Sequence, residues 1–360
     1  MSLASGCRTL AAALTLVFAV ACAAAGGSPP TGGTQPVREL VVLTWADYMS
    51  PELVKAFEQQ ARVKVKFVYF TDDDERDKMM VDARAGEFDI LCINEVSLPS
   101  YVRADWLEPL PADQIPNRAN IAPRWRNRFP EARDYAVAYF WGTLGIAYRT
   151  DLVSAPITSW KQLFSPDPKL RGRIAMIGHS RDLIGMALKS LGYSANSTDH
   201  EQLKQAKALL LAQKPFVKTY DYVSDPGNSP LVDGTAAAAV MFSGDALRVQ
   251  EVSPKVRYAL PAEGGNLWVD YLAILKTSTR KTLAKEFLDF INAPKMAAMN
   301  AGYVTYATPN AAAEKLMPAD YLQNPSIYPS QAVVDRSEYY AELPPRVEKI
   351  YNEIKSQVIR

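Results

Sequence analysis

The chain has 360 residues, 48% of them hydrophobic, and its 40 Lys and Arg nearly balance its 39 Asp and Glu. This near-neutral composition is typical of a globular protein and argues against nucleic-acid binding, which normally needs a basic surface. Only two histidines are present, which excludes a histidine-rich metal site and argues against a Ser-His-Asp triad. We therefore expect a binding protein with no cofactor, no metal and no catalytic residues.

The N-terminal segment predicts export. Arg8 precedes an uncharged apolar run that is too short to span a bilayer, and small residues follow it, which is typical of a signal peptide over residues 1–21. Ala19-Val20-Ala21-Cys22 resembles a bacterial lipobox, although leucine is usual where Ala19 stands. The alternative is a plain signal peptide with an incidental cysteine. We expect a lipid on Cys22, a flexible tether over residues 22–37, and a location in the periplasm or on the outer face of the cell membrane.

From residue 38 the pattern predicts alternating strands and helices. The first strands are expected at 39–45, 63–69 and 89–93, with helices at 51–60 and 72–85 between them. Later strands are expected at 173–177, 217–220, 236–242 and 256–260. Later helices are expected at 180–191, 199–213, 244–251, 281–291, 294–301 and 345–358. This order predicts α/β sheets with parallel strands, and a body of about 320 residues predicts two lobes.

Three short segments place an aromatic residue close to an aspartate. They are Trp45-Ala46-Asp47-Tyr48, Phe242-Ser243-Gly244-Asp245 and Trp268-Val269-Asp270-Tyr271. An aromatic face attracts a cation by roughly 0.5–2 kcal/mol, and a carboxylate accepts charge-assisted hydrogen bonds, so each pair suits an organic ammonium ion. If both members lie on one strand, residues i and i+2 point to the same face. The alternative is that these aspartates only begin turns at strand ends.

The segments also fall where ligands bind in open α/β sheets, beyond the carboxyl ends of strands. Four segments that follow predicted strands lie there: Trp45–Tyr48, Asn94–Val96, His179–Asp182 and Phe242–Asp245. Cys92 lies within the predicted strand at 89–93 and is expected to be a buried, inert thiol.

Further motifs extend the pattern over the body of the chain. They are Phe88-Asp89-Ile90, Phe140-Trp141-Gly142, Glu263-Gly264-Gly265-Asn266 and Tyr306-Ala307-Thr308-Pro309-Asn310. With them the chain resembles the spermidine/putrescine-binding proteins of bacterial ABC polyamine importers. The resemblance implies an α/β, two-lobed periplasmic-binding-protein fold (type II), each lobe a mixed sheet flanked by helices, with the ligand in the cleft between the lobes. It implies lobe 1 at 38–143 plus 268–312 and lobe 2 at 144–267 plus 313–360.

The resemblance also implies a ligand site and partners. The implied site residues are Trp45, Asp47, Tyr48, Asn94, Asp182, Phe242, Asp245, Trp268, Asp270 and Tyr306. The partners would be a polyamine and the membrane permease of an ABC importer, and we expect a monomer. Asn94 stands where serine is common, Val96 where spermidine-type members carry an aromatic residue, and His179 where they can carry an extra acid. These departures favour a putrescine-like diamine, with spermidine still open, and His179 is expected to be a neutral, solvated side chain or a pH-dependent group.

Other functions stay open at this stage. A protein of the same fold could take an iron complex or another organic cation. A polyamine sensor would use the same site to signal instead of feeding a transporter. An enzyme is the least favoured alternative, because the chain offers no histidine-based triad and no metal set.

Overall fold

The structure is a computed structural model that describes residues 38–84 and 86–360. The predicted signal peptide, Cys22 and the tether lie outside the described residues, as does Ala85, the predicted end of the second helix. Within the described ranges, no helix has both the length and the hydrophobicity needed to cross a membrane.

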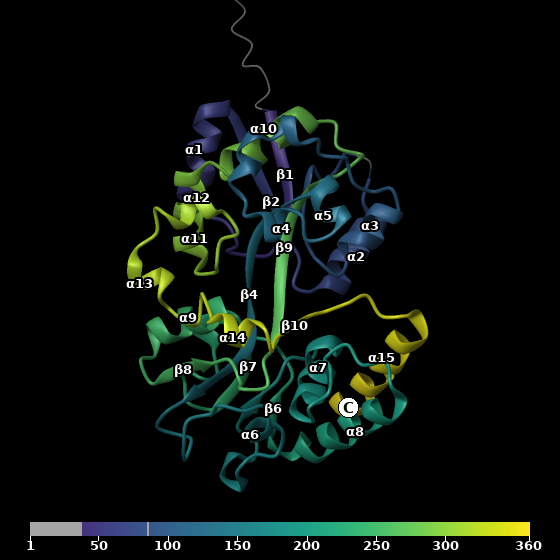
Figure 1. Cartoon of the computed structure of the whole chain (residues 1–360), viewed down its shortest axis with the longest axis vertical. Coiled ribbons are helices and arrows are strands. Elements are labelled where there is room, and N and C mark those ends of the chain that lie inside the picture. The colour runs from purple at the N-terminus through teal and green to yellow at the C-terminus, as the bar shows by residue number, and fades with distance from the viewer. Residues whose placement is uncertain (1–37, 85) are drawn as a thin grey trace, which may run out of the picture. The chain divides into compact units, whose positions relative to one another are not determined.

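One mixed sheet of ten strands runs through the structure in the order β2-β1-β3-β9-β4-β7-β5-β6, with β10 paired to β9 and β8 paired to β4. The strands are β1 (Arg38–Thr44), β2 (Val63–Tyr69), β3 (Ile90–Asn94), β4 (Ala136–Arg149), β5 (Ile174–Ala175), β6 (Val217–Thr219), β7 (Ala238–Phe242), β8 (Val256–Ala259), β9 (Asn266–Ile274) and β10 (Glu338–Tyr339). β1 pairs in parallel with β2 and β3, as predicted, whereas β9 runs antiparallel to β3 and β4. The long pair β4–β9 therefore joins the two halves of the sheet (Figure 1).

Helices flank the sheet, and the longer ones lie where the sequence predicts them. They are α1 (Pro51–Ala61), α2 (Asp73–Asp82), α3 (Leu98–Arg103), α4 (Pro123–Arg126), α5 (Pro130–Tyr135), α6 (Lys161–Phe164), α7 (Ser180–Ser190), α8 (His200–Gln213), α9 (Ser243–Val252), α10 (Lys281–Ile291), α11 (Pro294–Val304), α12 (Ala311–Glu314), α13 (Ala319–Leu322), α14 (Gln331–Val334) and α15 (Pro345–Ile359). Side chains of Ser50, Asp72 and Asp199 cap α1, α2 and α8 by accepting backbone N–H bonds.

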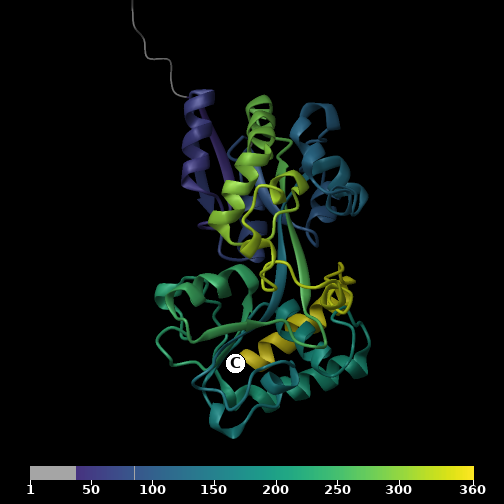
Figure 2. The same cartoon turned by 60° about the vertical axis from the view of Figure 1, so that its left-hand side comes forward.

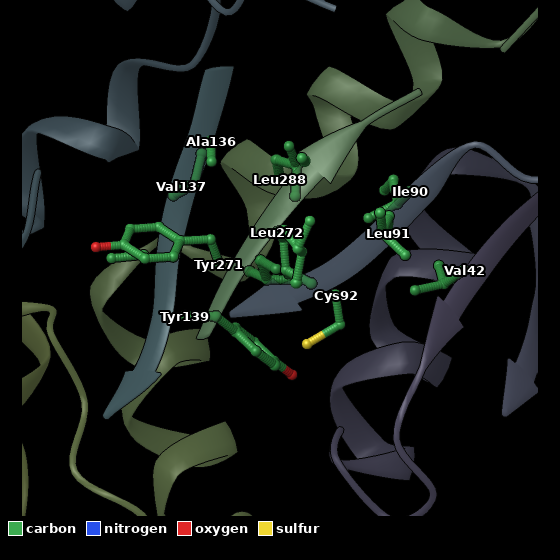
Figure 3. Close-up of a cluster of buried hydrophobic side chains, with 14 of the residues drawn as sticks. Val42, Ile90, Leu91, Cys92, Ala136, Val137, Tyr139, Tyr271, Leu272 and Leu288 are labelled. Carbon is green, nitrogen blue, oxygen red and sulfur yellow. The ribbon is translucent and has the colours of Figure 1, made fainter. Parts of the chain in front are cut away.

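Two large hydrophobic cores form on different parts of the chain. The first is built from residues between 40 and 141 and between 268 and 327 (Figure 3), and the second from residues between 144 and 240 and between 340 and 358. Cys92 is fully buried in the first core, opposite Leu272 in the β3–β9 register. Ile327 also belongs to the first core, although the predicted division assigns it to lobe 2. The lobe boundaries therefore stay a prediction.

The C-terminal helix α15 packs against α7 and α8 (Figures 1 and 2). Tyr351 of α15 is fully buried and its hydroxyl donates to the Ser197 carbonyl at 3.0 Å. The guanidinium of Arg181 on α7 lies over the rings of Tyr340 and Tyr351. These contacts fix the N-terminal turn of α7, which carries predicted site residues.

A buried carboxylate ties the start of β3 to β1 and to the loop after β9. Asp89 is fully buried and accepts hydrogen bonds from the Val41 N–H at 2.8 Å and the Ser278 hydroxyl at 2.6 Å. Its carboxylate also pairs with the Arg280 guanidinium at 2.8 Å. A buried charge of this kind is tolerated because every oxygen is hydrogen-bonded.

We expect Asp89→Ala to lower the free energy of unfolding by about 2–3 kcal/mol, because it leaves Arg280 and the Val41 N–H without their partner. The full cost of breaking a buried pair is reduced here, since Arg280 is 31% exposed. Urea denaturation measures the change. Glu342→Ala is the matched control, because Glu342 pairs with Arg103 on the surface and its loss should cost less than about 1 kcal/mol. Equal losses in both variants would contradict this account of Asp89.

Candidate functional site

The centre of the candidate site is Asp270 on β9. Asp270 lies opposite Asn94 in the antiparallel β3–β9 register and is 8% exposed. The Tyr48 hydroxyl donates to its Oδ2 at 2.9 Å. Among the residues that the structure describes, no Lys, Arg or His forms an ion pair with Asp270. A buried carboxylate without a counter-ion favours the approach of a cation, because the bound cation would offset its desolvation.

Burial also changes the acidity of this pair. Loss of water around Asp270, together with the nearby charge of Asp73, raises the pKa of its carboxyl to about 7, while the Tyr48 hydrogen bond and the charge of Arg76 oppose this rise. Burial raises the pKa of the Tyr48 phenol well above its usual value, and the charge of Asp270 adds to this. Tyr48 therefore stays a neutral donor, while Asp270 titrates near neutrality.

A chain of hydrogen bonds holds Tyr48 in place. The Tyr139 hydroxyl donates to the Tyr48 carbonyl at 2.7 Å, and the Asn300 amide donates to the Tyr139 hydroxyl at 2.9 Å. The side-chain Oδ1 of Asn300 accepts from the backbone N–H of Ser50 at 2.8 Å. Residues from β4 and α11 thus position the turn after β1.

Aromatic side chains pack beside Asp270. Trp268 precedes it by two residues on β9, so both side chains point to one face of the strand, as predicted. The Trp268 ring lies edge-on to Tyr306, with centroids 4.8 Å apart, and to Phe242 at 6.0 Å. Tyr48 meets Tyr306 at 6.1 Å. The four rings together form an apolar wall next to the carboxylate.

Two glycines make room for this wall. A Cβ on Gly142 would lie 2.6 Å from Cζ2 of Trp268, and one on Gly244 would lie 2.7 Å from the Tyr306 ring. Contacts this short do not occur between real side chains, so any larger residue would displace the rings. This gives a physical reason for glycine in the segments Phe140-Trp141-Gly142 and Phe242-Ser243-Gly244.

The expected geometry of Trp45 and Asp47 is wrong. β1 ends at Thr44, and Asp47 lies in a turn with a φ of 54°, so Trp45 and Asp47 do not share a strand face. Trp45 instead packs edge-on against Phe70 at 4.4 Å. The Asp47 carboxylate is 65% exposed and lies 3.6 Å from the Arg248 guanidinium.

Asp245 on α9 shares that arginine. The Tyr222 hydroxyl donates to the half-buried Asp245 carboxylate. Burial raises the pKa of Asp245, while the Tyr222 hydrogen bond and the charge of Arg248 oppose this rise. Arg248 therefore compensates part of the negative charge of both Asp47 and Asp245.

Asp182, in the first turn of α7, is also paired within the protein. It is 8% exposed, and the Tyr340 hydroxyl donates to its Oδ1 at 3.0 Å. His179 Nδ1 lies 3.3 Å from its Oδ2. Burial of His179 lowers its pKa, but the pairing with Asp182 and the charges of Asp73 and Asp74 outweigh this and raise it. The sequence left His179 open as a neutral, solvated side chain or a pH-dependent group, and its pairing with Asp182 favours the second.

Sequence reasoning missed a second layer around Asn94. The Asn94 amide donates to Asp73 Oδ2 at 2.7 Å, and Asp73 also pairs with the guanidinium of Arg76. Arg76 is 1% exposed and donates to Asp77 and to the Ser97 hydroxyl, both at 2.8 Å. The acids of α2 were interpreted as helix-start residues, which also describes Asp73. No separate feature of the sequence therefore indicated its place beside the site.

Glu95 lies within the segment Asn94–Val96 that follows a predicted strand, but its role as a further buried acid was not predicted. Its carboxylate accepts the Val269 N–H at 3.0 Å, and burial raises its pKa to about 8. Glu95 thus extends the contact between β3 and β9 past the last paired residues and holds the strand that carries Trp268 and Asp270. Over residues 38–84 and 86–360, no group of three or more His, Cys, Asp or Glu side chains is arranged to hold a metal ion.

The sequence is similar to those of known solute-binding and polyamine-related proteins. The profile of a family described as bacterial extracellular solute-binding protein matches residues 52–328. A norspermidine sensor of Vibrio cholerae is 35% identical over 300 residues, which cover 82% of each chain. A putrescine/agmatine-binding protein of Pseudomonas aeruginosa is 28% identical over 333 residues, which cover 87% of this chain and 90% of the relative.

The fold is shared with solved structures. One from Listeria monocytogenes, described as a putative spermidine/putrescine ABC transporter, superposes with a TM-score of 0.81 at 32% identity. The superposition covers 89% of this chain and 98% of the other. Its likeness confirms the predicted α/β solute-binding fold.

We expect Asp270→Asn to stabilise the ligand-free protein. Because the folded state raises the pKa of Asp270 to about 7, the folded protein holds this proton more tightly than the unfolded chain does. Ionisation therefore costs stability, and the cost grows as the pH rises from about 4 to about 7 and then stays constant. A neutral amide removes a cost of at most about 4 kcal/mol.

Urea denaturation of ligand-free protein at about pH 5 and about pH 8 measures this effect. The gain in unfolding free energy from Asp270→Asn should be larger at the higher pH. A gain of equal size at both values would show that ionisation of Asp270 costs the fold nothing.

Proposed function

Because this chain belongs to the bacterial extracellular solute-binding protein family, we propose that it captures a polyamine outside the cytoplasm, with a putrescine-like diamine favoured. The observation that carries the proposal is Asp270, a buried carboxylate beside Trp268 and Tyr306 that forms no ion pair with a Lys, Arg or His of the described residues. An ammonium ion supplies both the missing charge and hydrogen-bond donors. Relatives named for norspermidine and for putrescine and agmatine support the same class of ligand.

One ammonium group of the ligand would bind Asp270, and its methylene chain would lie along Trp268, Tyr306 and Phe242. A charge-assisted hydrogen bond contributes roughly 1.5–3 kcal/mol, and each buried CH₂ contributes about 0.8 kcal/mol. A second ammonium would point towards Asp182 or Asp245. We place the ligand between the two proposed lobes, at 38–143 plus 268–312 and at 144–267 plus 313–360, which would close on it as rigid bodies.

The other carboxylates are expected to contribute less than Asp270. Asp47 and Asp245 are partly compensated by Arg248, and Asp182 by His179. A ligand ammonium at these positions has to share a carboxylate with a protein cation. This ranking favours a ligand with few charges, in agreement with the departures from spermidine-type sequences at Val96 and His179.

The proposed setting is delivery to an ABC importer. A lipid on Cys22 would anchor a monomeric binding protein to the membrane, and the tether would let it reach the permease. The protein would perform no catalysis. An iron complex is a poorer match, because over residues 38–84 and 86–360 no group of three or more His, Cys, Asp or Glu side chains is arranged to hold a metal ion.

A thermal-shift titration of the full chain tests the function. We expect putrescine, cadaverine and agmatine to raise the unfolding midpoint more than spermidine and spermine do, because a ligand that binds only the folded state stabilises it, by about 2.7 kcal/mol at a hundred times Kd.

Asp270→Asn should weaken binding at least tenfold, about 1.4 kcal/mol. Asp113→Asn, an exposed acid far from the site in sequence and on another element, should leave binding unchanged. A flat response to every amine would refute the proposal.

A polyamine sensor is the second candidate, favoured by the 35% identity to the norspermidine sensor. Both functions use one ligand site, so binding data do not separate them. Uptake of labelled putrescine by cells with and without this gene does. We expect uptake to fall when the gene is deleted. Unchanged uptake, with binding of the purified protein intact, would favour the sensor.

A further inference from the structure

His179 lies where a ligand cation is expected to bind. It occupies the N-cap position of α7 without a capping bond from its side chain, is 36% exposed, and reaches the Asp182 carboxylate with Nδ1 at 3.3 Å. Asp182 itself is buried, and its other oxygen accepts the Tyr340 hydroxyl at 3.0 Å. Both oxygens of the Asp182 carboxylate, which is predicted to bind an ammonium group, are thus already engaged by the protein.

We propose that protonated His179 is an internal cation that competes with the second ammonium group of a diamine for Asp182. This inference rests on the proposed function and assigns His179 as a specificity-determining residue of the same site. When His179 is charged, Asp182 is satisfied and the ligand is held by Asp270 alone. When a ligand ammonium binds Asp182, the N–H bond at Nδ1 breaks and the proton passes to solvent.

The charges around His179 support this role. Asp182 faces it from its own helix, and Asp73 and Asp74 act on it from the first turn of α2. The other basic group of this turn, Arg181, is directed to the rings of Tyr340 and Tyr351 and to Asn196. Arg76 is engaged by Asp73 and Asp77.

Asp73 also links the two ends of the proposed ligand. Its charge acts on both Asp270 and His179, so the two groups lie within electrostatic reach of one carboxylate. A cation bound at Asp270 or at Asp182, the two ends of the proposed ligand site, relieves the repulsion among Asp73, Asp182 and Asp270. His179 supplies that relief at one end in the absence of ligand, whereas no cation of the described residues is paired with Asp270 and Arg76 acts on it only through its charge.

The consequence is a dependence of diamine affinity on pH. Because the ligand displaces a proton from His179, affinity should fall as the pH drops through the pKa of His179, by up to about tenfold per pH unit for one proton. Asp270 adds a second step in the same direction, since its carboxyl must ionise to bind the ammonium. Only the first of these steps should disappear when His179 is replaced.

Isothermal titration calorimetry of the full chain with putrescine, in two buffers of different ionisation enthalpy, counts the released protons. At about pH 6.5 we expect His179→Gln to release fewer protons than the unchanged protein and to keep its affinity better as the pH falls. His200→Gln is the matched control, because His200 is exposed at the start of α8. His179→Asn provides a second variant should the first fold poorly.

Imidazole NMR gives an independent reading, since the chain has two histidines and His200→Gln assigns them. Addition of putrescine should move the His179 resonances to the neutral form. Equal proton release in His179→Gln and the unchanged protein, or a His179 that stays charged in the complex, would overturn the inference while leaving polyamine binding intact. Absence of putrescine binding at every pH would instead refute the proposed function, and this inference with it.

Discussion

The candidate site depends on one unbalanced charge. Asp270 is buried on a central strand, where the Tyr48 phenol donates to it. No cation of the described residues forms an ion pair with it, and Arg76 acts on it only through its charge. Its neighbours are arranged around this deficit: Glu95 fixes the strand, Asn94 ties the site to Asp73, and two glycines admit the rings beside it. The protein thus keeps an unfavourable interaction in its core that a suitable ligand would relieve.

The position of Asp270 follows from the sheet. β9 is the one strand that pairs with β3, β4 and β10, and every residue from Asn266 to Ile274 is buried. β4 pairs with β9 for most of its length. It contributes Tyr139, which holds Tyr48, and Gly142, which leaves room for Trp268. These two strands connect both halves of the sheet. A change in the orientation of one half relative to the other would therefore act directly on the residues proposed to hold the ligand.

Much of this was predictable from the sequence, and the failures have physical causes. The sequence pattern indicated α1, α7, α8 and α10, and the spacing of Trp268 and Asp270 indicated a shared face. β4 escaped prediction because nearly all of its residues are buried, which removes the alternation that marks a strand. Asp47 was misplaced because its left-handed backbone ends the strand early, and Asp73 and Glu95 were missed because only folding brings them beside Asp270.

The burial of Cys92 has a practical consequence for studying motion in this protein. Cys7 would be lost with the predicted signal peptide and Cys22 would carry lipid, and Cys92 is enclosed by the first core. The processed chain would then react slowly with thiol reagents. Cysteines engineered onto exposed positions in each proposed lobe would accept a pair of fluorophores without removal of any native residue, so the distance between the lobes becomes directly observable by energy transfer.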